Sequence, residues 1–138
     1  MLTKTNLEHL AQMRLDDAIV LLRASKASSA YYLSGYAIEL ALKACISKLF
    51  QPDTIPDKAF VNAIYIHKPD ELLKVAGLTQ QFEADAKADP ELATNWVIAC
   101  KWNEASRYEF HSPLSAAALI TAIGDPQHGV FQWLKKHW

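Results

Sequence analysis

Near the end of the chain an arginine and a histidine lie close together in the sequence, and such a pair can hold an anion and transfer a proton. Arg107 and His111 are separated by three residues, so on a continuous helix both side chains would point the same way. An ordinary histidine has a pKa of about 6.5, which suits acid-base chemistry at neutral pH. Pro113 should fray the helix at His111. The alternative is therefore that Arg107 pairs with an acid such as Glu39 or Glu104, while His111 lies at an exposed helix end.

A second candidate face lies on a strongly patterned helix expected over residues 27–50. Tyr32, Gly35, Glu39 and Lys43 recur at spacings of three and four, so they share a face beside the apolar one. Glycine inside a helix costs roughly 1 kcal/mol relative to alanine, which indicates close approach of a backbone or a ligand at Gly35. The alternative is helix packing at Gly35 and an ordinary surface pair between Glu39 and Lys43, worth about 0.3 to 0.5 kcal/mol.

The other histidines and the glycines give no motif for metal or nucleotide chemistry. His9, His128 and His137 lie far apart in the sequence and have no metal-ligand spacing with each other or with the cysteines. We interpret His67, just before Pro69, as a packed or capping residue. No glycine-rich phosphate-binding motif occurs. We therefore expect neither a metal nor a cofactor.

Composition and charge restrict the class of protein. The chain has 138 residues, of which 51% are hydrophobic, enough for one domain over residues 1–138 with a sizeable core. Fourteen lysines and arginines against fifteen acids give a net charge of -1, so any contact with nucleic acid must be local. Cys45 and Cys100 suit buried hydrophobes in a reducing cytosol. No apolar run approaches the ~20 residues of a membrane span, and we expect a cytoplasmic protein.

The hydrophobic periodicity predicts an all-α fold, a compact bundle built on a long antiparallel helix pair. Thr3 or Thr5 is expected to cap the first helix, which should end near Ser25. Ser28 or Ser29 should begin the second helix. Because no alternating strand pattern with a hairpin signal occurs, strands are not expected, apart from an alternative short strand around residues 60–65.

Prolines and glycines divide the rest of the chain into shorter helices. Pro52 and Pro56 end the second long helix. The further elements are a helix capped by Asp57, one begun by Pro69 and closed by Gly77, a short one capped by Thr79, one begun by Pro90 and broken after His111, and helices over residues 114–123 and 130–138.

Three stretches carry a family resemblance. Residues 30–44, AYYLSGYAIELALKA, resemble the signature helix of the HEPN superfamily. Residues 67–73, HKPDELL, followed by 76–78, AGL, resemble that family's histidine-and-leucine region. In residues 102–108, WNEASRY, a helix is expected to end in an arginine-tyrosine pair as it does there. The likeness spans about residues 7–138 and is closest to small stand-alone prokaryotic members.

This resemblance implies a helical bundle that often dimerises and that acts in RNA cleavage, nucleotide or nucleic-acid binding, toxin-antitoxin pairs or phage defence. Nuclease members carry an arginine, usually followed by a polar residue, and a histidine separated from the arginine by four to six intervening residues, whereas three intervene here. Arg107 and His111 are the nearest match, although Tyr108 replaces the small polar residue and the spacing is short. In such a pair the histidine moves protons to and from the ribose 2′-hydroxyl and the leaving oxygen, and the arginine stabilises the phosphate.

The resemblance leads to a hypothesis with two alternatives. The chain would be a homodimer through its long helices that binds RNA or a nucleotide, with Tyr32, Glu39, Lys43 and Tyr108 lining or bracing the groove. The first alternative is a non-catalytic module that pairs with a nucleotidyltransferase, an antitoxin or another protein, and the second is a small-molecule sensor. The aromatic and basic tail over residues 132–138 could hold RNA, or could dock its tryptophans on the core.

Overall fold

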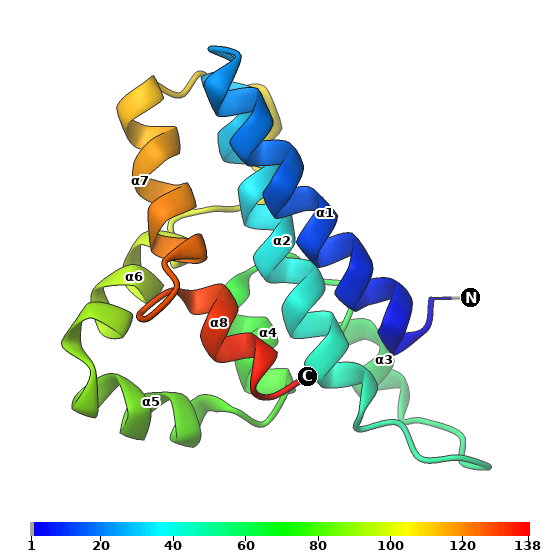
Figure 1. Cartoon of the computed structure of the whole chain (residues 1–138). Helices are drawn as coiled ribbons and strands as arrows, with labels where there is room; N and C mark the ends of the chain where they lie inside the picture. Colours follow the sequence, from blue (N-terminus) through cyan, green and yellow to red (C-terminus); the bar gives the residue numbers. More distant parts are fainter. Residues whose placement is uncertain (1) are drawn as a thin grey trace.

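Two long antiparallel helices, α1 (Lys4–Arg23) and α2 (Ala27–Ser47), run along one side of the molecule (Figure 1). The computed structural model describes residues 2–138, and within them it contains helices and no strand. The predicted all-α bundle on a long helix pair is thus confirmed, and the alternative strand around residues 60–65 is wrong because that segment begins as a helix.

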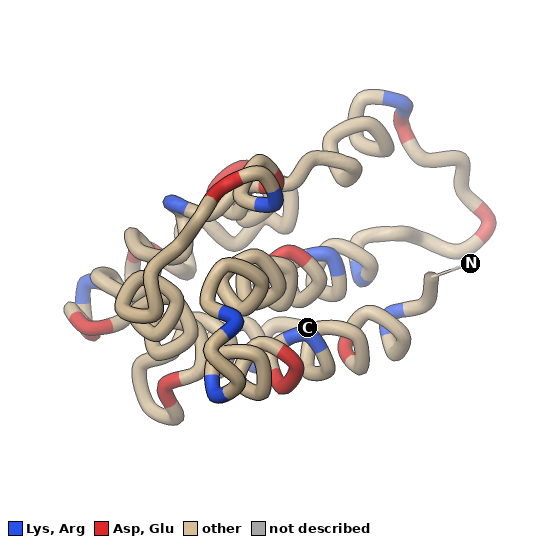
Figure 2. The backbone as a smooth tube through the Cα atoms, turned by 90° about the horizontal axis from the view of Figure 1, so that it is seen from above, with Lys and Arg blue, Asp and Glu red and all other residues tan. Residues whose placement is uncertain are grey.

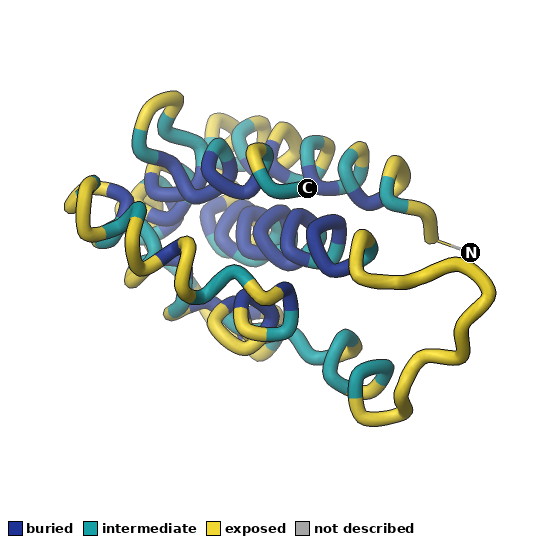
Figure 3. Tube along the Cα trace, turned by 90° about the horizontal axis from the view of Figure 1, so that it is seen from below, coloured by how far each residue is buried: buried dark blue, intermediate teal, exposed yellow. Residues whose placement is uncertain are grey.

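Helix α2 contacts α1, α4 (Pro69–Val75), α7 (Pro113–Gly124), α8 (Val130–Lys135) and the 3₁₀ helix η1 (Glu104–Tyr108). Figure 3 shows α2 as a buried coil in the middle of the fold. Basic and acidic positions are interspersed along the chain in Figure 2. The other helices are α3 (Lys58–Ala63), α5 (Thr79–Ala88) and α6 (Pro90–Cys100).

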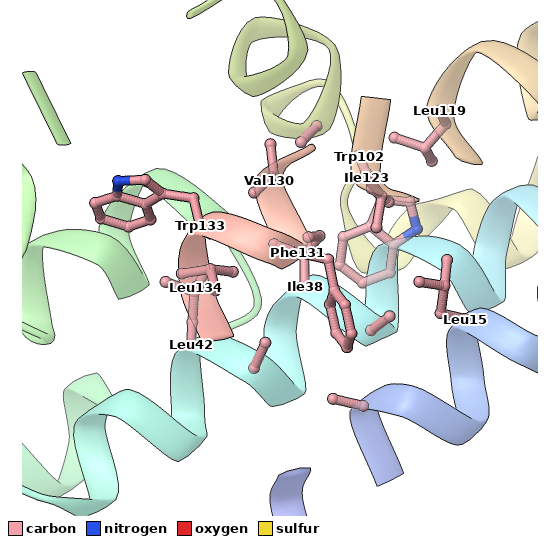
Figure 4. Close-up of a cluster of buried hydrophobic side chains, with 14 of the residues drawn as sticks. Leu15, Ile38, Leu42, Trp102, Leu119, Ile123, Val130, Phe131, Trp133 and Leu134 are labelled. Atoms are coloured by element: carbon pink, nitrogen blue, oxygen red, sulfur yellow. The ribbon is translucent and has the colours of Figure 1, made fainter. Parts of the chain in front are cut away.

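The core forms where the inner face of α2 meets α7, α8 and the indole of Trp102 (Figure 4). Four alanines of α2, which are Ala30, Ala37, Ala41 and Ala44, are fully buried and allow neighbouring elements to approach its backbone. Trp133 is buried as well, and Lys135 donates to the side chain of Gln12. The C-terminal tail therefore docks on the core.

Local signals set several of the helix starts. Thr3, rather than Thr5, caps α1, and its side chain accepts a hydrogen bond from the backbone of Asn6. Pro69, Pro90 and Pro113 each occupy the first turn of a helix. The prediction that Thr79 caps α5 is wrong because Leu78 holds the capping position without a side-chain hydrogen bond.

The largest difference from expectation lies between α6 and α7. Helix α6 ends at Cys100 instead of continuing towards His111. The buried ring of Trp102 takes the chain into the core, and the Asn103 side chain accepts from the backbone of Ala105 to begin η1. The chain is extended again at Glu109. Arg107 and His111 consequently do not share a continuous helix.

Candidate functional site on helix α2

A buried carboxylate lies at the centre of the polar surface of α2. Glu39 is 3% exposed. Lys43 Nζ donates to its Oε1 over 2.7 Å, and His67 Nδ1 lies 3.1 Å from each of its oxygens. The surface ion pair considered as an alternative is therefore wrong, because Glu39 is enclosed by the fold and is shared between two partners.

Two helices bring these three groups together. Glu39 and Lys43 are one turn apart on α2, so their pairing is local. His67 comes from the segment that leads into α4, whose first residue, Pro69, is buried and which packs on α2. Because a carboxylate only accepts, His67 Nδ1 must be the donor. In the neutral ring the lone pair is then on Nε2, which has no hydrogen-bond partner within residues 2–138.

Two tyrosines extend the polar surface along the same side of α2. The Tyr32 hydroxyl donates to that of Tyr36 over 3.4 Å, and the rings meet edge to face with centroids 5.1 Å apart. Burial, and next the hydrogen bond with Tyr32, raise the pKa of Tyr36 well above its ordinary value. Glu39 raises this pKa further while Arg107 lowers it, so Tyr36 lies within electrostatic reach of both charges.

Arg107 lies at the other end of this row. Its guanidinium is 4.9 Å from the centre of the Tyr108 ring, a cation-π arrangement. The hydroxyls of Tyr108 and, next, Tyr32 raise the pKa of Arg107. Within the described chain Arg107 forms no ion pair. The alternative pairing with Glu39 or Glu104 is therefore wrong.

Gly35 allows an aromatic side chain to lie directly on the backbone of α2. A Cβ atom at this position would be 2.1 Å from Cδ2 of Trp102. The indole Nε1 also donates to the Tyr32 carbonyl over 3.1 Å. The close approach expected at Gly35 is thus made by a side chain, and not by a ligand or another backbone. Because η1 begins two residues after Trp102, this contact positions Arg107.

His111 is held by packing rather than exposed at a helix end, so that expectation is wrong. Its ring stacks on Tyr31 with centroids 3.6 Å apart and an interplanar angle of 10°. Its backbone N–H donates to Ser28 Oγ over 2.9 Å. The buried Nε2 lies 3.2 Å from a Glu109 carboxylate oxygen but makes no hydrogen bond.

We call the surface formed by Tyr32, Tyr36, Glu39 and Lys43, together with His67 and Arg107, the α2 polar face. Tyr32 and Lys43 are eleven residues apart, about 16 Å along the helix. Two permanent cations and one carboxylate give it a net charge of +1 with neutral His67. Exposed Tyr108 adjoins Arg107. The surface therefore offers charge for one anionic group and an aromatic ring beside it.

The sequence contained an overlooked signal for one member of this face. Tyr36 lies four residues after Tyr32 and three before Glu39, so helical spacing alone places it on the same side. His67 has no comparable local signal because it is 28 residues from Glu39. Its interpretation as a packed or capping residue misses the bond to the buried carboxylate.

A separate pocket of about 700 Å³ opens between the start of α1, the end of α2 and the two residues that follow α3, Ile64 and Tyr65. Lys43 belongs to both the pocket wall and the α2 polar face.

Within residues 2–138 no helix is long and apolar enough to cross a bilayer, and no three His, Cys, Asp or Glu side chains cluster as metal ligands. Comparison of the chain with protein-family models, curated proteins and solved structures gives no match.

Proposed function

We propose that the α2 polar face binds RNA or a nucleotide in a HEPN-like domain, and that the bound RNA is cleaved without a metal, as in a toxin-antitoxin or defence ribonuclease. The observation that carries this proposal is the combination of an unpaired arginine with the buried Glu39 and its two partners on one side of α2. The resemblance of residues 30–44 to the HEPN signature helix supports it.

Arg107 and Tyr108 supply the binding chemistry. A guanidinium without a carboxylate partner is free to hold a phosphate in a fork of two hydrogen bonds. Tyr108 is 78% exposed, so its ring can stack on an unpaired base. A net charge of -1 over the whole chain makes such binding local to this face.

The first experiment incubates the purified protein with a pool of structured and single-stranded RNA in the presence of chelator. We expect the parent to cleave RNA. The RNA affinity of Arg107→Ala should be lower by about tenfold or more, because a charge-assisted hydrogen bond to phosphate is removed. Arg23→Ala is the matched control, since Arg23 is exposed at the end of α1. Circular dichroism checks that helicity is retained.

His111→Ala in the same assay tests the arginine-histidine pair suggested by the sequence. Loss of cleavage with retained helicity would assign His111 to the reaction, and unchanged cleavage would remove it. A parent that neither binds nor cleaves RNA would refute the proposed function as a whole.

A non-catalytic interaction module is the second candidate, favoured by apolar surface next to the site. Phe110 is 99% exposed and Leu114 is 82% exposed, and both follow Tyr108 closely in the chain. Such residues suit a protein partner, for example a nucleotidyltransferase or an antitoxin. Phe110→Asp should abolish capture of that partner and leave RNA binding unchanged if this candidate is correct.

Dimerisation and location are also proposals. Met13 and Val20 are exposed one above the other on the outer side of α1, so we propose that the homodimer forms through the long helices. Val20→Glu should convert it to a monomer in analytical ultracentrifugation. Cys45 and Cys100 are free thiols, which fits the proposed cytoplasmic location.

A further inference from the structure

We infer that His67, and not His111, transfers the proton in the proposed RNA cleavage, with Glu39 and Lys43 as positioning residues. This inference rests on the proposed function, because it names the proton-transfer group of that same site. It follows from three differences between the two histidines: the hydrogen-bond partner of the ring, whether Nε2 is open or enclosed, and the exposed fraction of the side chain.

Glu39 fixes the ring of His67. The two carboxylate oxygens lie at the same distance of 3.1 Å from Nδ1, so the imidazole N–H points between them. The neutral ring is thereby held in the tautomer whose Nε2 accepts a proton. A carboxylate that orients a histidine in this way is the common supporting arrangement of histidine bases.

Glu39 is itself held by the fold. It is buried on the central helix, and Lys43 occupies one of its oxygens over 2.7 Å. The side chain of Lys43 is 21% exposed, so the fold covers most of it. Position and direction of the His67 ring are therefore set by side chains whose own freedom is small.

His111 lacks these features. Its side chain is 14% exposed, against 39% for His67. Its ring lies flat on Tyr31, and its Nε2 is buried next to Glu109 without a hydrogen bond. A nitrogen enclosed in this way cannot reach a ribose hydroxyl without movement of the chain.

Arg107 and His67 border the same side of α2. The Tyr32 hydroxyl raises the pKa of Arg107, and His67 lies at hydrogen-bond distance from Glu39. Tyr32 and Glu39 are seven residues apart, about 10 Å along the helix. Tyr36 lies between Tyr32 and Glu39 in the sequence, and its pKa is raised by Glu39 and lowered by Arg107. A strand of RNA laid along α2 would meet the guanidinium with a phosphate and the imidazole with a neighbouring ribose.

The reaction needs no further reagent. His67 Nε2 takes the proton of a ribose 2′-hydroxyl, and the 2′-oxygen attacks the adjacent phosphorus. The new P–O2′ bond forms as the P–O5′ bond breaks, which gives a 2′,3′-cyclic phosphate and a free 5′-hydroxyl. The departing 5′-oxygen receives a proton from water, and His67 returns its proton to the resulting hydroxide.

The test compares single-turnover cleavage of RNA in chelator by the parent, His67→Gln and His111→Phe. Glutamine can still donate to Glu39 but cannot carry a proton, whereas phenylalanine keeps a ring stacked on Tyr31. We expect His67→Gln to be slower by about 100-fold or more with unchanged RNA affinity, and His111→Phe to stay within a few-fold of the parent. Added imidazole should partly restore cleavage in His67→Ala.

Glu39→Gln tests positioning by a signal that structural damage would not produce. Nitrogen NMR of the imidazole should show His67 protonated on Nδ1 in the parent, and a population protonated on Nε2 in the variant, with the fold unchanged. A His67 ring already protonated on Nε2 in the parent would overturn the role of Glu39.

The remaining outcomes separate the two proposals. If the parent cleaves RNA and His67→Gln cleaves equally fast, His67 is not the proton-transfer group while the proposed function stands. If the parent binds RNA without cleaving it under single-turnover conditions, the ribonuclease activity and the role of His67 are both refuted, and only the binding proposal remains.

Discussion

Gly35 is the position where one added methyl group should disturb both the core and the placement of Arg107. In Gly35→Ala the new Cβ would be 2.1 to 2.2 Å from three ring atoms of Trp102. The indole is 1% exposed and is tied to the Tyr32 carbonyl by its N–H. An overlap of this depth is too large for a small shift, so the ring must leave its site.

The expected magnitude combines two opposing effects. Alanine in a helix interior stabilises by about 1 kcal/mol relative to glycine. Loss of a packed tryptophan from a core costs about 3 to 5 kcal/mol. The net loss of unfolding free energy in Gly35→Ala is therefore about 2 to 4 kcal/mol, and at about 3 to 5 °C per kcal/mol Tm should fall by roughly 6 to 20 °C.

Urea and thermal unfolding measure this loss, and two further variants interpret it. Gly124→Ala is the control, since its Cβ would meet only the Leu15 side chain at an ordinary 3.8 Å. In a Trp102→Ala background the clash is absent, so Gly35→Ala should there stabilise by up to about 1 kcal/mol. An equal effect of Gly35→Ala in both backgrounds, or a parent-like Tm with Trp102 present, would refute the reasoning.

Three further predictions concern groups away from the α2 polar face. The hydrogen bond to Asp89 raises the pKa of His128 and lowers that of Asp89. The contribution of His128 to stability is therefore complete below its unfolded pKa of about 6.5 and is lost as pH rises through the folded pKa. The Tm advantage of the parent over His128→Gln should thus shrink between pH 6 and pH 9, and a constant difference would contradict this. Burial raises the pKa of Cys45 to about 11 and that of Cys100 to about 12, so iodoacetamide at pH 8 should label both thiols at least about 100-fold more slowly than in unfolded protein, whereas equal rates would show that they are accessible. Thr3→Ala removes the cap of α1 and should lower the free energy of unfolding by about 0.5 to 2 kcal/mol in urea titrations, a prediction that a stability equal to the parent's would refute.

Local sequence determined the helices and which residues share a face of α2. Apolar residues repeat at helical spacing along α1 and α2, and prolines mark the first turns of α4, α6 and α7. These signals act within one or two turns, where a missing N–H, a capping oxygen or an apolar stripe directly changes the energy of the helix. The common side of Tyr32, Glu39 and Lys43 follows from the same periodicity.

Tertiary structure alone decided what lies against that face. Residues 102–111 leave the helical path of α6, which ends at Cys100, and Trp102 is instead buried against Gly35. His67 meets Glu39 across 28 residues of chain because α4 packs on α2. Contacts between distant segments depend on which surfaces the whole core brings together, and neither periodicity nor capping carries that information.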